Sequence, residues 1–217
     1  MAAFDLEEQE QISQIKGWWE QYGKLVTGVA VAAALASVGW QGWTWYKGKQ
    51  TLEASALYDQ LQTAAAEHNA QKAREVAGAL IDKYGATAYA DLAALLSAKV
   101  QVDAGDLKNA RVPLSWAATK ANDPALRDIA RLRLATVMFD EKAYDEALAQ
   151  LQAPVDDSLT ARFADLKGDV LVAQGKKDDA RAAYKSVIAS LETATKAEAV
   201  TLREIVQAKL DAVGGAQ

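Results

Sequence analysis

Hydrophobic and polar positions follow two different patterns along the chain. Residues 25–46 form a single uncharged run, bounded by Lys24 and Lys47. After residue 50, apolar residues recur with helical periodicity, and no stretch shows the sustained period-two alternation of a strand. The pattern predicts an all-α protein in which a single N-terminal transmembrane helix, residues 25–46, is followed by a helical domain, residues 47–217.

The uncharged run has the length and the flanking residues of a membrane span. A helix over residues 25–46 is about 33 Å long at about 1.5 Å per residue, which matches the roughly 30 Å hydrocarbon layer of a bilayer. Aromatic residues, which prefer the membrane interface, flank its apolar centre on both sides: Trp18, Trp19 and Tyr22 before it, and Trp40, Trp43, Trp45 and Tyr46 at its end.

The uncharged run has two other interpretations. A signal peptide begins with a basic leader, but residues 1–24 carry five acidic residues against Lys16 and Lys24. Ala34, Leu35 and Ala36 do resemble a cleavage site, so removal of the segment stays open as an alternative. A buried helix of a soluble domain is disfavoured, because such helices rarely run this far without a charge. We expect a mobile tail at residues 1–11 and the entry of the anchor helix at residues 12–24.

One face of the predicted span carries small residues. Gly28, Ala32 and Ala36 recur every four residues, which predicts a face where another membrane helix could pack closely. The lysines do not orient the span, because two precede it and two follow it closely. The short leader and the long following domain favour a cytoplasmic N-terminus and an exported C-terminal domain.

An internal repeat organises the residues after the span. Ala73, Ala110, Ala147 and Ala180 are separated by 37, 37 and 33 residues, and each follows a predicted turn centred on His68, Gly105, Lys142 or Gly175. This spacing is close to the 34 residues of the tetratricopeptide repeat (TPR), a pair of antiparallel helices. The sequence predicts a TPR-like α-solenoid of about four helix pairs with a C-terminal capping helix. Helices are expected at residues 51–67, 70–84, 88–104, 107–120, 124–140, 143–152, 158–174, 177–193 and 196–212.

The last predicted helix has no partner in the repeat. Glu198, Arg203, Glu204 and Lys209 suit a solvated cap over the end of the stack. Paired carboxylates at residues 156–157 and 178–179 stand where helices begin, and capping together with the helix dipole accounts for them.

The residues that enzymes and metal sites need are scarce. The chain has one histidine, His68, and no cysteine, so neither a triad with spare partners nor a thiolate or multi-histidine metal site can be assembled. No glycine cluster adjoins a Lys-Ser or Lys-Thr pair, as a phosphate loop requires. After residue 50 the chain has 20 basic against 24 acidic residues, without a basic stripe. We therefore expect no enzyme, no cofactor and no nucleic-acid partner.

A TPR stack binds other proteins through the concave wall formed by its first helices. The repeat register places both apolar and charged side chains there. The apolar members could instead be buried between helices, and that alternative stays open. The candidate protein-binding residues are Tyr58, Leu95, Lys99, Leu132, Thr136, Phe139, Asp165 and Asp169.

The whole layout resembles the YfgM family of proteobacterial inner-membrane proteins. The likeness lies in the acidic opening at residues 4–11, the Lys-Gly-Trp-Trp entry at residues 16–19 and the segment at residues 54–58. The resemblance implies an ancillary subunit of the SecYEG translocon in the bacterial inner membrane. Its periplasmic domain would work beside the membrane-anchored chaperone PpiD and hand over unfolded or translocating proteins without chemistry. The alternative is a membrane tether that sequesters or protects a soluble cytoplasmic regulator.

Overall fold

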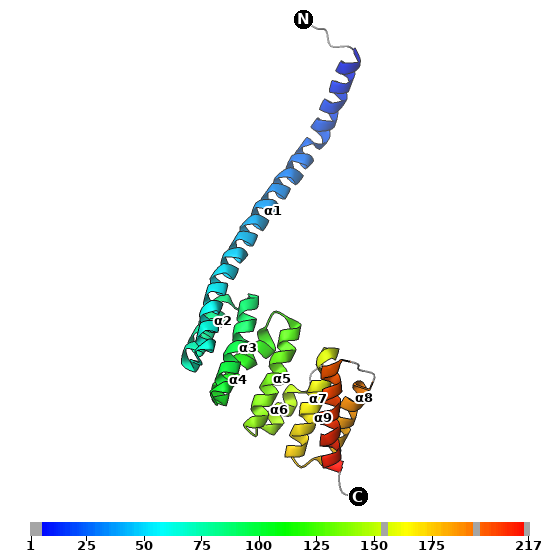
Figure 1. Ribbon diagram of the computed structural model, residues 1–217. Coiled ribbons are helices and arrows are strands. Elements are labelled where there is room, and N and C mark those ends of the chain that lie inside the picture. Colours follow the sequence, from blue (N-terminus) through cyan, green and yellow to red (C-terminus); the bar gives the residue numbers. More distant parts are fainter. Residues whose placement is uncertain (1–5, 153–155, 193–195, 215–217) are drawn as a thin grey trace. The chain divides into compact units, whose positions relative to one another are not determined.

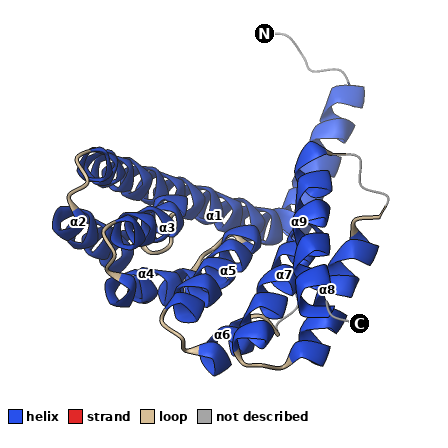
Figure 2. Ribbon diagram, turned by 60° about the horizontal axis from the view of Figure 1, so that its bottom comes forward, coloured by secondary structure: helices blue, strands red, loops and turns tan. Residues whose placement is uncertain are grey.

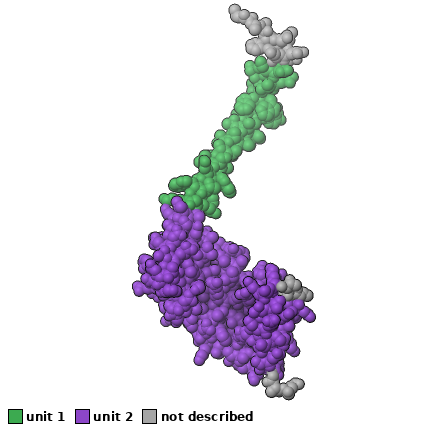
Figure 3. Space-filling view, in the orientation of Figure 1, with its two compact units in different colours: residues 1–50 green, residues 51–217 purple. Residues whose placement is uncertain are grey.

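The computed structural model describes residues 6–152, 156–192 and 196–214, and these residues form nine helices and contain no strand (Figure 2). The chain divides into two compact units, residues 1–50 and residues 51–217 (Figure 3). The all-α prediction is confirmed.

The first helix, α1, runs from Leu6 to Ala66. Among the described residues it is the one helix long and apolar enough to cross a membrane, with a mean hydropathy of 1.5 in its most apolar window. The expected mobile tail is wrong for residues 6–11, which are helical, while residues 1–5 lie outside the described residues. Glutamate and glutamine dominate this segment and are strong helix formers, so the acidic leader extends the helix.

The other helices follow the predicted order (Figure 1). For three of them, α2, α4 and α5, the predicted ends agree with the structure, whereas α6 is shorter than predicted and α9 is shifted. Their bounds are α2 Ala70–Tyr84, α3 Ala88–Asp103, α4 Leu107–Lys120, α5 Pro124–Asp140, α6 Tyr144–Gln150, α7 Asp157–Ala173, α8 Lys177–Ser190 and α9 Ala197–Gly214.

The helices form four pairs, α1 with α2, α3 with α4, α5 with α6 and α7 with α8. The turns inside these pairs share one backbone geometry. The four turn residues of the repeat all have positive φ: 53° at His68, 77° at Gly105, 62° at Lys142 and 76° at Gly175. In each turn the next N–H donates to the carbonyl five residues earlier, as Ala143 does to Met138 at 2.8 Å. This left-handed closure is the usual C-terminal stop of a helix, and it confirms the predicted turns.

The repeated alanines lie where two helices approach each other closely. Ala73, Ala110, Ala147 and Ala180 are all fully buried, and each starts its helix by donating to a carbonyl four residues back. The residue four positions later is also buried in every pair. It is Ala77 in the first pair, Leu114 in the second, Leu151 in the third and Tyr184 in the fourth.

The core of the domain consists of three apolar clusters. The first joins α1 to α2 and α3 around Leu61 and Leu80. The second and largest runs from α3 to α7 around Leu114 and Leu134. The third joins α7, α8 and α9 around Tyr184. A core distributed in this way is typical of a solenoid, in which each pair contacts only its neighbours.

Candidate binding groove

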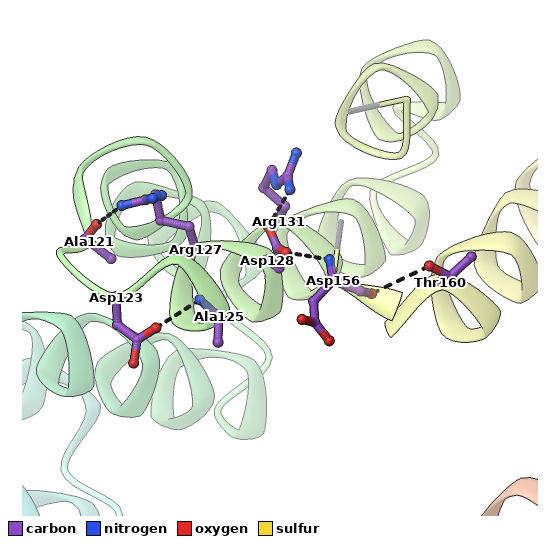
Figure 4. Close-up of polar contacts among 8 residues, drawn as sticks. All are labelled: Ala121, Asp123, Ala125, Arg127, Asp128, Arg131, Asp156 and Thr160. Atoms are coloured by element: carbon purple, nitrogen blue, oxygen red, sulfur yellow. Dashed lines mark hydrogen bonds and ion pairs between the residues drawn. The ribbon is translucent and has the colours of Figure 1, made fainter. Parts of the chain in front are cut away.

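Two buried or half-buried aspartates fasten the connections between helix pairs. Asp91, in the first turn of α3, is 1% exposed and accepts from the backbone N–H of Asn122 at 2.9 Å. Asp128 in α5 accepts from the backbone N–H of Asp156 at 3.0 Å and pairs with Arg131 (Figure 4). Each aspartate thereby ties a first helix to the segment that leads into the next one.

Helix-capping side chains set the ends of these connections. Asp123 accepts from the N–H of Ala125 at 2.8 Å and caps α5 (Figure 4). Asp156 accepts from the N–H of Ser158 at 2.9 Å and caps α7, as predicted. For residues 178–179 the capping part of the prediction is wrong, whereas the helix-dipole part agrees with the structure, because both aspartates lie in the first turn of α8. There the cap position of α8 is held by Lys176, and Asp178 pairs with Arg181 from inside the first turn.

Asp165 is the third member of the aspartate series, 37 residues after Asp128 as Asp128 is after Asp91. Its partner is the ammonium of Lys209 in α9, at 2.7 Å. Lys209 also contacts Asp169 at 2.8 Å, and the Tyr184 hydroxyl donates to Asp169 at 2.7 Å. The expectation that Lys209 is a solvated cap residue is therefore wrong, because it fastens α9 to α7.

The environment of this network shifts its protonation equilibria. Burial raises the pKa of Asp165 above its ordinary value, although Lys209 opposes the shift. Burial alone would lower the pKa of Lys209, but its hydrogen bonds to Asp165 and Asp169 outweigh burial and leave that pKa raised. Burial, and then the bond to Asp169, raises the pKa of Tyr184. At neutral pH the tyrosine is therefore a neutral donor and the lysine a cation.

A groove of about 640 Å³ lies between α5, α7 and α9, and we refer to it as the α9 groove. Four of the predicted protein-binding residues line it together, Leu132 and Thr136 from α5 and Asp165 and Asp169 from α7. Its other lining residues are Arg162, Leu166, Ala197, Glu198, Thr201, Leu202 and Ile205. None of these residues was predicted to bind a partner, because α9, including Glu198, was assigned only a capping role. The pairing of Asp165 with Lys209 holds α9 against α7 and gives it a second role, as one side of the groove.

The remaining predicted residues of the wall lie outside the α9 groove. Leu95 is buried in the largest core cluster, and Lys99 is exposed and pairs with Asp103. The Tyr58 ring packs against Tyr89 at 5.6 Å between ring centroids. Phe139 packs against Tyr144 in the same manner, at 5.9 Å.

The predicted packing face of the membrane helix is exposed along α1. Gly28, Ala32 and Ala36 all lie on the surface. Apart from the neighbouring residues and the nearby backbone of the same helix, no heavy atom lies within 4 Å of the place where a Cβ on Gly28 would stand. Gly28 also lines a shallow groove with Trp19, Gly23, Lys24, Thr27 and Val31. This face can therefore admit a neighbouring helix at close range.

Among the described residues, no group of three or more His, Asp, Glu or Cys side chains could hold a metal ion. The α9 groove instead combines apolar leucines and Ile205 with a few charged groups. That combination suits the recognition of a polypeptide segment. The fold and the groove together define a helical-repeat protein that has an apolar N-terminal helix and a groove of a kind suited to a polypeptide segment.

Comparison with known proteins gives the family. A model of the tetratricopeptide repeat-like domain matches residues 16–215. A relative from Haemophilus influenzae is 32% identical over 84% of this chain and 89% of its own length. One from Neisseria gonorrhoeae is 30% identical over 97% of this chain and 99% of its own, and one from Escherichia coli is 28% identical over 90% and 94%. All three are named ancillary SecYEG translocon subunit. The chain belongs to this family, the YfgM family.

Proposed function

We propose that this protein is a membrane-anchored scaffold and an ancillary subunit of the SecYEG translocon. In this proposal α1 crosses the inner membrane once, with the N-terminus in the cytoplasm and residues 47–217 in the periplasm. The α9 groove holds segments of unfolded or translocating proteins and passes them to periplasmic chaperones such as PpiD, by binding and without turnover. The observation that carries the proposal is the convergence of Leu132, Thr136, Asp165 and Asp169 on one groove, in a chain related to named translocon subunits.

The position of the anchor is supported by its length and its uncharged composition, which suit contact with membrane lipid. The small-residue face at Gly28, Ala32 and Ala36 is where we place contact with other membrane helices. A photo-reactive amino acid at Ala32 tests this, with Val38, exposed elsewhere on the same span, as the matched position. Cross-links to translocon subunits from Ala32 that greatly exceed those from Val38 are expected.

The orientation of the domain can be measured directly, because the chain has no cysteine to remove. A Ser190→Cys variant in intact cells with a permeabilised outer membrane is treated with a membrane-impermeant thiol reagent. The proposal expects labelling at residue 190 and protection of a Gln14→Cys control until the inner membrane is breached. The opposite pattern would refute the periplasmic scaffold and favour the cytoplasmic tether for a soluble regulator.

Binding in the groove needs its own test. A photo-reactive residue at Thr136, which is exposed and lines the groove, is expected to capture translocating chains and PpiD during active export. Val112 on α4 is 68% exposed and serves as the matched position outside the groove. Equal capture from the two positions would contradict the assignment of the groove.

A further inference from the structure

The α9 groove carries more negative than positive charge. Its lining contains the carboxylates of Asp165, Asp169 and Glu198 and one guanidinium, that of Arg162. Lys209 reaches Asp165 and Asp169 from α9 but brings a single ammonium to the two carboxylates. Three carboxylates therefore face two cations, and the groove keeps a negative surplus.

Lys209 itself shows which chemistry the carboxylate pair accepts. Its ammonium lies between Asp165 and Asp169, and it stands 5.9 Å from the centre of the Tyr184 ring. The Asp165 and Asp169 side chains stay 18% and 27% exposed with this lysine in place. Both carboxylates therefore keep an accessible side, on which a further cation would be attracted.

Apolar side chains lie beside the acidic ones. Leu132 and Leu166 from the stack and Leu202 from α9 are half-buried, while Ile205 is 49% exposed. A large exposed apolar residue at the edge of a groove is a favourable contact for another apolar side chain. The groove thus offers an apolar contact and an acidic contact within one site.

We propose that the α9 groove selects polypeptide segments in which a lysine or arginine stands next to apolar residues. The cation of the segment lies against Glu198 and the accessible sides of Asp165 and Asp169, and its apolar residues lie against Ile205 and the leucines. The inference rests on the proposed function, because it names the kind of segment that the groove holds. It adds a charge preference that a purely apolar groove lacks.

The test uses the full-length protein in detergent and three short fluorescein-labelled amphipathic peptides. The peptides share their leucine positions and differ at one central residue, which is lysine, glutamine or glutamate. Fluorescence anisotropy gives the three dissociation constants. We expect the lysine peptide to bind about three- to tenfold more tightly than the glutamate peptide, with the glutamine peptide between them and the difference shrinking as salt is added.

Substitutions at two exposed residues that line the groove change its charge without removing a side chain from the core. Glu198→Gln is expected to reduce the lysine preference, and Arg162→Gln to increase it. Glu204→Gln is the matched control, because Glu204 lies on the same helix but lines a different groove, between α8 and α9. This control should leave the preference unchanged.

The site of binding is fixed by cross-linking each peptide, through a photo-reactive group, to the full-length protein. Cross-links to α5, α7 or α9 residues of the groove, with the expected order of affinities, would support the inference. Cross-links there without any charge order would overturn the inference and leave the proposed function standing. Cross-links only outside the groove would overturn both.

Discussion

The ring of Tyr184 fills the space that a side chain on Gly168 would need. A Cβ built on Gly168 would stand 2.3 Å from Cε1 of Tyr184, far inside van der Waals contact. Both residues are buried, and the tyrosine is further held by its hydrogen bond to Asp169. The close approach of α7 and α8 therefore depends on glycine at this one position.

Gly168→Ala is expected to lower the free energy of unfolding by about 1–3 kcal/mol, because the ring must move out of a packed core. Circular dichroism during denaturant unfolding of the full chain in detergent measures this. The control is Gly78→Ala in α2, where nothing lies within 4 Å of the added atom. It should stabilise by about 0.5–1 kcal/mol, because alanine favours the helix. A harmless Gly168→Ala would contradict the packing described.

The non-glycine turns provide a second prediction. Lys142 holds φ at 62°, a region that costs a residue with a Cβ roughly 1–2 kcal/mol. Lys142→Gly should therefore stabilise the domain by about 0.5–1 kcal/mol after allowing for the greater freedom of glycine in the unfolded chain. Gly175→Ala should destabilise it by a similar amount, since its φ is 76°. Thermal denaturation of each variant beside the unmodified protein shows whether its stability rises or falls. A loss of stability in Lys142→Gly would contradict the positive φ described for Lys142.

The buried aspartate of α3 provides a third prediction. Asp91→Ala removes the acceptor of the Asn122 backbone N–H and should cost about 1–3 kcal/mol. Asp103→Ala in the same helix removes an exposed pair with Lys99 and should change stability by less than about 1 kcal/mol. Equal effects of the two substitutions in urea unfolding would show that the joint between α4 and α5 does not depend on Asp91.

Alkaline pH should weaken the attachment of α9. The folded-state pKa values of Tyr184 and Lys209 are both raised, so the folded state retains protons that the unfolded state releases. Their contribution is fully present below the ordinary pKa values, about 10 for tyrosine and 10.4 for lysine, and is lost as the pH rises above them. The destabilisation caused by Tyr184→Phe should therefore shrink as the pH rises above about 10. Tyr58→Phe is the control, and a pH-independent effect at Tyr184 would contradict the network.

The repeat could be predicted from the sequence because its signals are local. Small residues at fixed spacing and turn residues before each of them mark the pairs, and Ala147 with Lys142 shows both within six residues. The ends of α2, α4 and α5 follow from the same turns and caps. The helical leader was missed because acidic composition was interpreted as a mobile tail.

The site could be predicted only in part, because its second side comes from α9. The register brought Leu132, Thr136 and the two aspartates of α7 together, but it gave no sign that Lys209 reaches them across 44 and 40 residues of sequence. One signal in the sequence was not used: Asp91, Asp128 and Asp165 recur with the same 37-residue spacing as the first three repeated alanines. Aspartates at a fixed repeat spacing indicate a shared structural role. The spacing does not indicate which residue each aspartate contacts.

The common geometry of the four turns also determines where the length of a repeat can change. Each turn residue stands five positions before its alanine, in every pair, so the shorter 33-residue interval cannot arise there. It coincides with α6, which has 7 residues where α4 has 14. In this chain the shortening therefore falls on α6 and the segment that leaves it, while the turn keeps each pair of helices in the same register.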